Sequence, residues 1–390
     1  MRLTFFSNYF NHHQEALCNA FAERLKDGFT FVETEPMEGF RSKMGWERQA
    51  PSYVLKSHLS RTDWDKAMAL GRESDVVIMG TAPEVLIEER LKLNKLTFRY
   101  SERPLKEGRW KVLVPHLAYK FYHNHFRNRH KELYILAAGA YCSSDYHFLK
   151  SYEGKCYKFG YFPEKVKKSF EELSKLKSGN KPMKVLWAGR FLKLKRPDLM
   201  VRAATALKKQ GMGFSLEFVG DGTELKGIKD MIDREGLKDR TEFKGFLSPE
   251  DTRREMEGAD IFVMTSNNLE GWGSVIYEAL SAGCAVVASH AAGASPFLIE
   301  DGKNGFIFRS GDLSMLTEKL GTLLKNRELS EKMGEAAYRN MQDSWNPRVA
   351  AERLIALSES KLGGERLVYE SGPLSPCPLL YMRAFGESLK

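Results

Sequence analysis

Two glutamates eight residues apart, Glu270 and Glu278, accompany a glycine-containing loop that could hold an anion. The segment 261–289 contains an apolar run, a polar loop ending in Gly271-Trp272-Gly273, an amphipathic stretch and a second apolar run. This order predicts a strand–loop–helix–strand unit of a parallel sheet. Glycines at a helix N-terminus expose backbone N–H groups at the positive end of the helix dipole, which favours binding of a diphosphate.

The spacing of the two glutamates is compatible with two interpretations. In the first, Glu270 faces a reacting centre and Glu278 binds a ribose hydroxyl pair, as acidic residues do in dinucleotide sites. In the second, Glu270 caps the helix and Glu278 is a solvated helix charge. A Gly-x-Gly loop alone does not decide between them.

The wider motif resembles a known family. Glu270-Gly-Trp-Gly, four residues, and then Glu278-Ala-Leu-Ser-Ala-Gly-Cys-Ala-Val-Val-Ala-Ser is similar to the E-x7-E signature of retaining family-4 glycosyltransferases. The resemblance covers residues 183–360 through motifs and residues 1–163 only through the order of elements. It implies the GT-B fold, an α/β architecture of two doubly wound, Rossmann-like domains that face a cleft.

The resemblance also implies roles for individual residues. Glu270 would hold the donor sugar and support its oxocarbenium-like centre, and Glu278 would bind ribose. A Gly-Arg pair followed five residues later by lysine resembles the family's diphosphate-binding pair, so Arg190 and Lys195 would neutralise the leaving diphosphate without a metal. Lys193 and Arg196 compete for this role, and a solvated loop is the plain alternative. The other donor-binding positions implied are Gly271, Trp272, Gly273, Ser274, Gly220 and Phe246.

The length of 390 residues predicts more than one domain. We expect an acceptor-side domain at 1–163, a solvated linker at 164–182 and a nucleotide-sugar domain at 183–345. We also expect a helix at 346–362 that crosses back to the first domain, and a loosely ordered tail at 363–390.

Candidates for binding the acceptor follow a predicted strand at 96–100. Glu102 there is placed to take the proton of an acceptor hydroxyl, and Arg103 to bind an anionic sugar or phosphate. A helix cap followed by a surface ion pair is the open alternative. His12, beside His13, is a further acceptor-side candidate, although histidines without a visible partner are often surface residues.

The charge of the chain is uneven. Residues 101–200 hold 22 lysines and arginines against 9 acidic residues, whereas the whole chain carries a net charge of +9. Within this block, residues 113–131 interleave aromatic and basic side chains. Such a helix either docks on an anionic membrane or lies on the surface with its aromatic rings in the core. No zinc-finger spacing or RNA-binding motif accompanies the block, so nucleic acid is not an expected partner.

The remaining expectations concern location and reaction. No apolar run of about 18 residues predicts a membrane span, and residues 1–8 lack the charged lead of a signal peptide. The five cysteines show no metal-like spacing, which favours reduced thiols. We therefore expect a cytoplasmic enzyme, with a possible position at the inner face of the cell membrane. It would need no cofactor or metal and would move a hexosyl unit from a nucleotide-diphosphate sugar to a glycan or lipid-linked acceptor during polysaccharide biosynthesis. The alternatives are a GT-B nucleotide-sugar epimerase and a non-catalytic nucleotide-sugar-binding protein.

Overall fold

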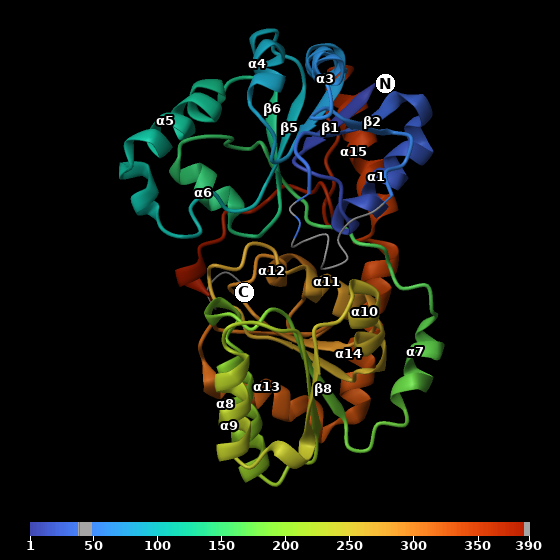
Figure 1. The fold of residues 1–390 in the computed structure, drawn as a ribbon, viewed down its shortest axis with the longest axis vertical. Helices are drawn as coiled ribbons and strands as arrows, with labels where there is room; N and C mark the ends of the chain where they lie inside the picture. The colour runs from blue at the N-terminus through green and yellow to red at the C-terminus, as the bar shows by residue number, and fades with distance from the viewer. Residues whose placement is uncertain (38, 40–48, 386–390) are drawn as a thin grey trace. The chain divides into compact units, whose positions relative to one another are not determined.

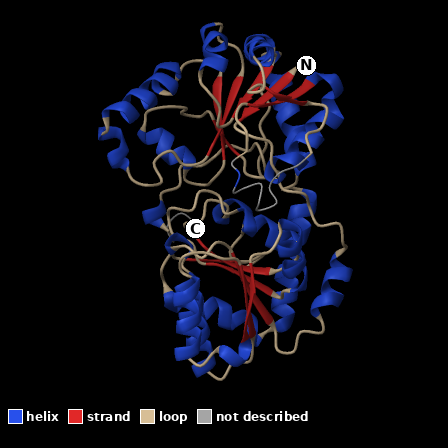
Figure 2. Ribbon diagram, viewed as in Figure 1, coloured by secondary structure: helices blue, strands red, loops and turns tan. Residues whose placement is uncertain are grey.

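The chain forms two compact units in a computed structural model that describes residues 1–37, 39 and 49–385. The N-terminal unit comprises Met1–Glu164 and Ser344–Tyr381, and the C-terminal unit comprises Lys165–Asp343 and Met382–Lys390. Each unit is a parallel β-sheet with helices packed against it (Figures 1 and 2). No helix in the described part of the chain combines the length and apolar character needed to cross a bilayer.

The N-terminal unit is built on a parallel sheet with the strand order β3-β2-β1-β4-β5-β6-β7. Its inner strands are almost completely buried, as expected when helices cover both faces of a parallel sheet. The strands are β1 (Leu3–Ser7), β2 (Phe29–Glu33), β3 (Val54–Lys56), β4 (Val76–Met79), β5 (Thr97–Ser101), β6 (Leu133–Ala137) and β7 (Cys156–Lys158). The helices are α1 (His12–Leu25), α3 (Arg61–Glu73), α4 (Val85–Lys92), α5 (Pro115–Asn124), α6 (Cys142–Phe148) and α15 (Pro347–Leu362).

The C-terminal unit has a second parallel sheet with the order β10-β9-β8-β11-β12-β13. Its core contains Trp187, Phe191 and Phe218, whose rings lie against one another. The strands are β8 (Lys184–Ala188), β9 (Ser215–Val219), β10 (Thr241–Gly245), β11 (Ile261–Met264), β12 (Ala285–Ser289) and β13 (Phe306–Phe308). The helices are α7 (Phe170–Lys177), α8 (Pro197–Lys209), α9 (Leu225–Arg234), α10 (Pro249–Gly258), α11 (Ser274–Ser281), α12 (Ser295–Leu298), α13 (Leu313–Lys325) and α14 (Arg327–Asp343).

The strand order reverses between β8 and β11, which pair with each other although β9 and β10 lie between them in sequence. The chain continues from β8 towards one side of the sheet and from β11 towards the other. Loops that leave the carboxyl ends of two such strands diverge, and open α/β sheets bind their ligands at this point. In the C-terminal unit these are the loops 189–196 and 265–273.

The segment 164–182, predicted to be a solvated linker, is mostly exposed but partly helical. It contains α7, which begins with a capping box between Ser169 and Glu172 and buries Leu173. The Lys177 side chain is also buried, and its ammonium donates to the carbonyls of Ala282 and Gly283 at the C-terminal end of α11. Composition did not indicate this contact, because a lysine that caps another helix has the same local sequence as a solvated one.

The tail is also more ordered than predicted up to residue 385. The backbone of 374–377 pairs with β7, with N–H···O bonds of 2.8 Å from Leu374 to Lys158, from Lys158 to Ser375 and from Cys377 to Cys156. Leu374 is 1% exposed. The tail thus covers the outer edge of the sheet, whose backbone groups would otherwise lack partners. Before it, α15 packs against α1, where Arg24 and Glu352 form an ion pair.

Candidate functional site

The N-terminus of α11 places backbone N–H groups at the switch point of the C-terminal unit. The helix begins after Gly273, which adopts a left-handed conformation (φ 88°), and no side chain of the described residues caps it. A Cβ atom at Gly273 would lie 3.1 Å from Cε of Met264 and would be strained at this φ. The missing cap and the glycine together leave room for an anion at the positive end of the helix.

Glu270 and Lys195 meet at the topological switch point. The Lys195 ammonium donates to Oε2 of Glu270 at 2.6 Å, and the Ser266 hydroxyl donates to the same oxygen at 3.0 Å. The two charged side chains are only 15% and 13% exposed. A shielded ion pair is screened less by salt than an exposed one, so each charge helps to fix the other in place.

Hydrogen bonds between the two loops hold this ion pair. The Thr265 hydroxyl donates to the Lys195 carbonyl at 2.7 Å and accepts from the Trp187 indole N–H at 2.9 Å. The backbone N–H of Asn267 donates to the Leu194 carbonyl at 2.8 Å. The lysine and the glutamate are therefore positioned by rigid backbone rather than by flexible side chains alone.

The neighbouring cations differ in their availability. Arg196 forms two hydrogen bonds with Asp198, at 2.9 and 3.0 Å, so it is already paired. Lys193 and Arg190 are exposed. Neither of them forms an ion pair with a carboxylate among the residues that the structure describes. Arg190 is thus open to an external anion, whereas Lys195 would have to share its ammonium between Glu270 and a diphosphate.

Glu278 lies inside α11 and is only 7% exposed. Burial raises the pKa of its carboxyl group to about 7; Arg253 of α10 opposes this rise, and Glu250 adds to it. A solvated helix charge, the alternative interpretation of the sequence, is therefore excluded for Glu278. Perturbed carboxyl groups beside a ligand-binding loop are common in functional sites.

The other residues of the loop contribute in different ways. The Trp272 side chain is 1% exposed and lies against Phe297. Its ring is therefore too buried to contact a donor, so the predicted donor contact could be made only by the backbone of Trp272. Gly271 is buried and accepts a hydrogen bond from the N–H of Gly293. Ser274 is half-buried at the first position of α11.

Gly220 and Phe246 follow β9 and β10 at the same edge of the sheet. Gly220 has φ 129°, and a Cβ atom there would lie 2.0 Å from the Gly189 carbonyl oxygen, so only glycine lets these two loops approach. Phe246 is 50% exposed. An exposed aromatic ring at this edge of the sheet offers a flat face for stacking.

In the N-terminal unit, Glu102 belongs to a small polar cluster. Its carboxylate accepts from the Tyr161 hydroxyl at 2.9 Å and from the Lys106 ammonium at 3.2 Å. The ring of His13 stacks on Tyr161 with 5.8 Å between centroids. A histidine, a tyrosine and a carboxylate thus come together, as is usual where hydroxyl groups are bound.

The other two acceptor-side candidates are less available. Arg103 makes two hydrogen bonds to Asp145, at 3.2 and 3.1 Å, and its side chain is 12% exposed, so its charge is already neutralised. His12 is 7% exposed at the start of α1. The alternatives considered from the sequence were that Arg103 forms a surface ion pair and that His12 is a surface residue. Both alternatives are wrong, because both side chains are enclosed.

Sequence reasoning missed several residues of these clusters. Ser266 precedes Glu270 by four residues in the same loop. This short separation was the one signal in the sequence that could have indicated their contact. Tyr161 and Asp145 lie 59 and 42 residues from their partners, and no local pattern connects them. No group of three His, Cys, Asp or Glu side chains that could hold a metal ion occurs in the described ranges.

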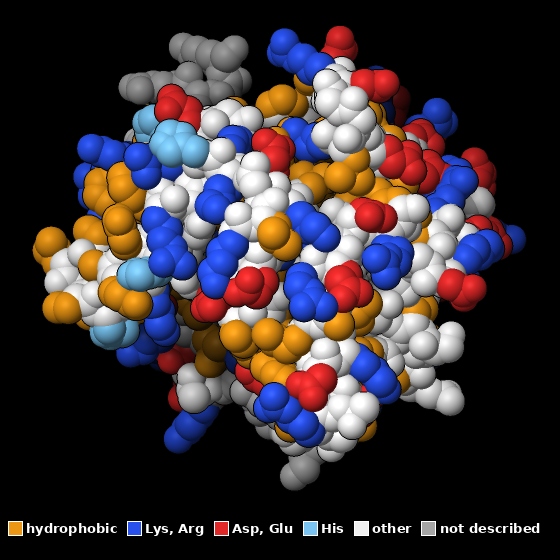
Figure 3. Space-filling view, turned by 90° about the horizontal axis from the view of Figure 1, so that it is seen from above, with side chains coloured by type: hydrophobic (Ala, Val, Ile, Leu, Met, Phe, Trp, Pro, Cys, Tyr) orange, Lys and Arg blue, Asp and Glu red, His pale blue; other side chains and the backbone are white. Residues whose placement is uncertain are grey.

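The basic aromatic stretch forms an exposed surface. Helix α5 buries none of its residues, and Tyr119 and Tyr122 are 62% and 53% exposed. Trp110 and Leu113, which precede the helix, are exposed as well. Figure 3 shows hydrophobic, basic and histidine side chains together at its left edge, the side on which α5 lies in Figure 1. The interpretation that these aromatic rings enter the core is therefore wrong.

Comparisons with known proteins show which family this part of the chain resembles. Residues 168–340 match the family model described as glycosyl transferases group 1. Spore coat protein SA of Bacillus subtilis is 29% identical over 182 residues, which are 45% of this chain and 48% of that protein. A GDP-mannose-dependent alpha-(1-6)-phosphatidylinositol monomannoside mannosyltransferase of Mycolicibacterium smegmatis is 29% identical over 185 residues, 46% of this chain and 48% of that protein. The chain thus spans about half the length of these curated relatives.

Among solved structures, HepE of Anabaena in complex with UDP superimposes with a TM-score of 0.67 and 18% sequence identity. The superposition covers 93% of this chain and 100% of that one. At this identity the likeness shows the fold. It confirms the predicted fold class, GT-B, with two Rossmann-like α/β domains.

Proposed function

Since residues 168–340 match the family model of the group 1 glycosyltransferases, we propose that the protein transfers a hexosyl unit from a nucleotide-diphosphate sugar to a hydroxyl acceptor. The observation that carries this proposal is the ion pair of Lys195 and Glu270 at the switch point of the C-terminal sheet. It puts a cation suited to phosphate and a carboxylate suited to sugar hydroxyls beside the open N-terminus of α11.

In this proposal the donor binds through its three parts. Phe246 stacks on the base, and Glu278 accepts hydrogen bonds from the ribose. The diphosphate lies on the amides of Gly271, Gly273 and Ser274, with Arg190 and Lys195 as its cations. Glu270 holds the hexose and stabilises the positive charge that develops at its anomeric carbon. Fixed charges of both signs thus act where charge develops in the transition state.

The reaction exchanges one bond at the anomeric carbon. The bond to the diphosphate oxygen breaks, and a bond to the acceptor oxygen forms on the same face, which retains the configuration. The acceptor's proton passes to the departing phosphate, or to Glu102, the candidate base of the N-terminal unit. The clustering of Glu102 with Tyr161 and Lys106 supports a role in holding the acceptor hydroxyl. His12 and Arg103 are further acceptor-side residues in this proposal. This scheme needs no metal or cofactor.

We infer the classes of donor and acceptor from the relatives. The mycobacterial relative is named for GDP-mannose and a phosphatidylinositol mannoside, and HepE was solved with UDP. We therefore propose a nucleoside diphosphate sugar as donor and a lipid-linked or cell-surface glycan as acceptor. The exposed aromatic and basic side chains of α5 support contact with an anionic membrane. The cysteines are free thiols, which fits a reducing cytoplasm.

The test begins with a thermal-shift screen of UDP, GDP and ADP sugars, because a ligand that binds only the native state stabilises it. The best donor is then incubated with and without lipid-linked and polysaccharide acceptors. Release of nucleoside diphosphate and a glycosylated product that retains the anomeric configuration by NMR would establish the proposal. Conversion of the donor without acceptor would establish the epimerase instead. If the donor binds but no acceptor is glycosylated, the protein is instead a non-catalytic nucleotide-sugar-binding protein.

A further inference from the structure

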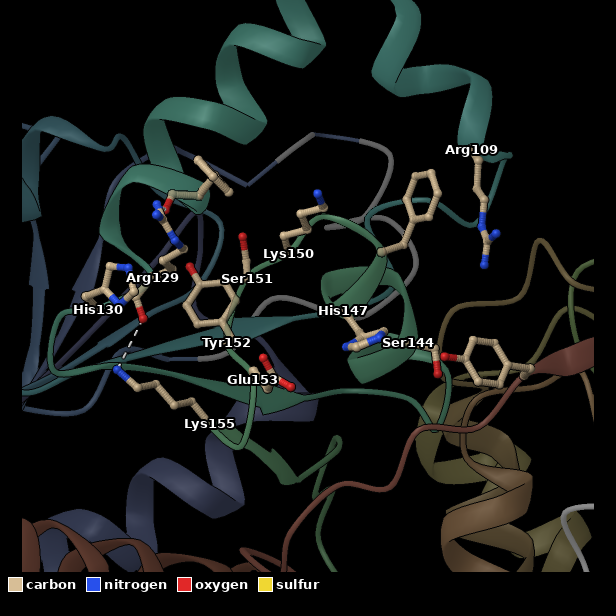
Figure 4. A pocket seen from close by; sticks show the side chains of 13 residues that line it. Arg109, Arg129, His130, Ser144, His147, Lys150, Ser151, Tyr152, Glu153 and Lys155 are labelled. Atoms are coloured by element: carbon tan, nitrogen blue, oxygen red, sulfur yellow. Dashed lines mark hydrogen bonds between the residues drawn. The ribbon is translucent and has the colours of Figure 1, made fainter.

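A cavity of about 990 Å³ lies in the N-terminal unit, lined by residues to which the proposed reaction gives no role. Its walls come from α6, the loop 149–155 and the turn 126–130, with Arg109 at one end (Figure 4). Tyr381 of the tail completes it. A volume of this size is typical of a site for a small-molecule ligand rather than for a single ion.

The cavity wall is strongly basic. Arg109, Arg129, Lys150 and Lys155 line it, and Glu153 is its one carboxylate. None of these four cations forms an ion pair with a carboxylate among the described residues, although many lysines and arginines elsewhere in the chain do. Concentrated positive charge that no carboxylate neutralises raises the local concentration of an anionic ligand.

Aromatic rings orient two of the cations. The Arg109 guanidinium lies over Phe148 with 4.4 Å to the ring centroid, and that of Arg129 lies over Phe126 at 4.0 Å. Arg129 also donates one N–H to the Phe126 carbonyl at 3.0 Å. A stacked guanidinium keeps its remaining N–H donors in a fixed plane, an arrangement that matches two oxygens of a phosphate.

Lys155 is held in place by the backbone. Its ammonium donates to the carbonyls of Lys131 at 2.6 Å and Arg129 at 3.3 Å, and a lysine has a third proton to donate. Burial lowers the pKa of Lys155, while Glu132 opposes this change. An anion that compensates for this burial would therefore be favoured at Lys155.

We propose that this cavity binds a phosphate-bearing glycan segment with more than one negative charge. Figure 4 shows Arg129 and Lys155 towards one end of the cavity, Arg109 towards the other and Lys150 between them, which suits charges spaced along a chain. The rings of Phe126, Phe148 and Tyr381 offer apolar faces for the sugar or polyol between the phosphates. That this ligand is the acceptor rests on the proposed function, whereas anion binding itself does not.

The tail completes this site. Ser143 and Ser144 of α6 donate through their hydroxyls to the carbonyls of Pro378 and Leu380, which brings Tyr381 to the cavity. Both the cavity and the tail lie outside residues 168–340, the segment matched by the family model. In this proposal the site selects the acceptor, while the matched segment binds the donor.

The experiment measures binding of a soluble glycerol-phosphate oligomer to the full chain, without nucleotide, by titration calorimetry at low salt. The cavity variant is Arg109→Gln/Lys150→Gln, because both side chains are exposed and their loss should leave the fold intact. The matched control is Lys66→Gln/Arg72→Gln on α3, which removes the same charge from side chains paired with Asp63 and Glu73. Neutral dextran oligosaccharide and vesicles of phosphatidylglycerol or phosphatidylcholine are the other probes.

We expect the oligomer to bind about tenfold more weakly to the cavity variant, which is a loss of about 1.4 kcal/mol of binding free energy. Its affinity for the control variant should be unchanged. Equal weakening in both variants, or binding lost in Lys195→Ala but kept in the cavity variant, would overturn the proposal. Binding to phosphatidylglycerol vesicles alone, lost in the cavity variant, would overturn it in favour of a lipid headgroup. A nucleotide thermal shift on the same variants tests the donor site separately, so failure of one proposal is distinguishable from failure of the other.

Discussion

The ammonium of Lys195 lies 2.6 Å from Oε2 of Glu270, although 75 residues separate them in the sequence. They come from the loops after β8 and β11, two strands that are neighbours in the sheet but not in the chain. The proposed phosphate cation and the proposed sugar carboxylate are therefore one assembled unit before any donor arrives. Preorganised charges need little rearrangement during the reaction, which is the main source of electrostatic catalysis.

Glu270→Gln keeps the size of the side chain but removes its negative charge. We expect transfer to fall by about 10²–10³-fold, because the charge that faces the anomeric carbon is lost. Steady-state kinetics with the donor found by thermal shift measures this. Glu242→Gln, an exposed glutamate of β10, is the matched control and should retain full activity. Near-normal turnover of Glu270→Gln would exclude a catalytic role for the Lys195–Glu270 pair.

Ser266 should act through Glu270 rather than on the substrate. Ser266→Ala removes the 3.0 Å hydrogen bond to Oε2 of Glu270 while leaving the ion pair. We expect kcat to fall by about tenfold with little change in KM, the size of one lost hydrogen bond to a charged group. In the double variant with Glu270→Gln, the serine should have no further effect. Additive losses would mean that Ser266 contacts the donor independently.

The buried carboxyl group of Glu278 should make stability depend on pH. Its pKa is about 7 in the native state against 4.5 for the free side chain, so the folded protein keeps a proton that the unfolded chain releases. Stability therefore falls as pH rises from 4.5 to 7, by about 3 kcal/mol from this group. Denaturant unfolding at pH 5 and pH 8 should show that Glu278→Gln removes this loss. The control Glu328→Gln, at an exposed glutamate, should keep the loss of stability. A wild-type stability that does not depend on pH would contradict the raised pKa of Glu278.

The sequence predicts those parts of the fold that depend on local pattern. The first apolar run of the segment 261–289 is β11 (Ile261–Met264), and the amphipathic stretch after the glycine-containing loop is α11 (Ser274–Ser281). The pairing of Lys195 with Glu270 was not visible, because their proximity depends on the reversal of strand order. The contacts of Lys177 and Arg103 were not visible for a similar reason: a charge enclosed by distant carbonyls or a distant aspartate has the same local sequence as a solvated one.

Gly220 should tolerate no side chain. A Cβ atom there would lie 2.0 Å from the Gly189 carbonyl oxygen, at a φ of 129° that other residues rarely adopt. We expect Gly220→Ala to lower the free energy of unfolding by about 3 kcal/mol or more and to weaken nucleotide binding. Gly227→Ala is the matched control, because a Cβ atom in that part of α9 meets nothing within 4 Å. It should leave stability unchanged or raise it by about 0.5–1 kcal/mol.

Leu374 tests whether the tail is part of the N-terminal unit. Its side chain is 1% exposed, beside backbone bonds that join the tail to β7, whereas Leu379 is 48% exposed. We expect Leu374→Ala to lower the free energy of unfolding by about 2–4 kcal/mol, the cost of an unfilled cavity in a packed core. Leu379→Ala should change it by less than about 0.5 kcal/mol. Denaturant unfolding of both variants measures the difference, and equal small effects would show that the tail is loosely attached, as its composition had suggested.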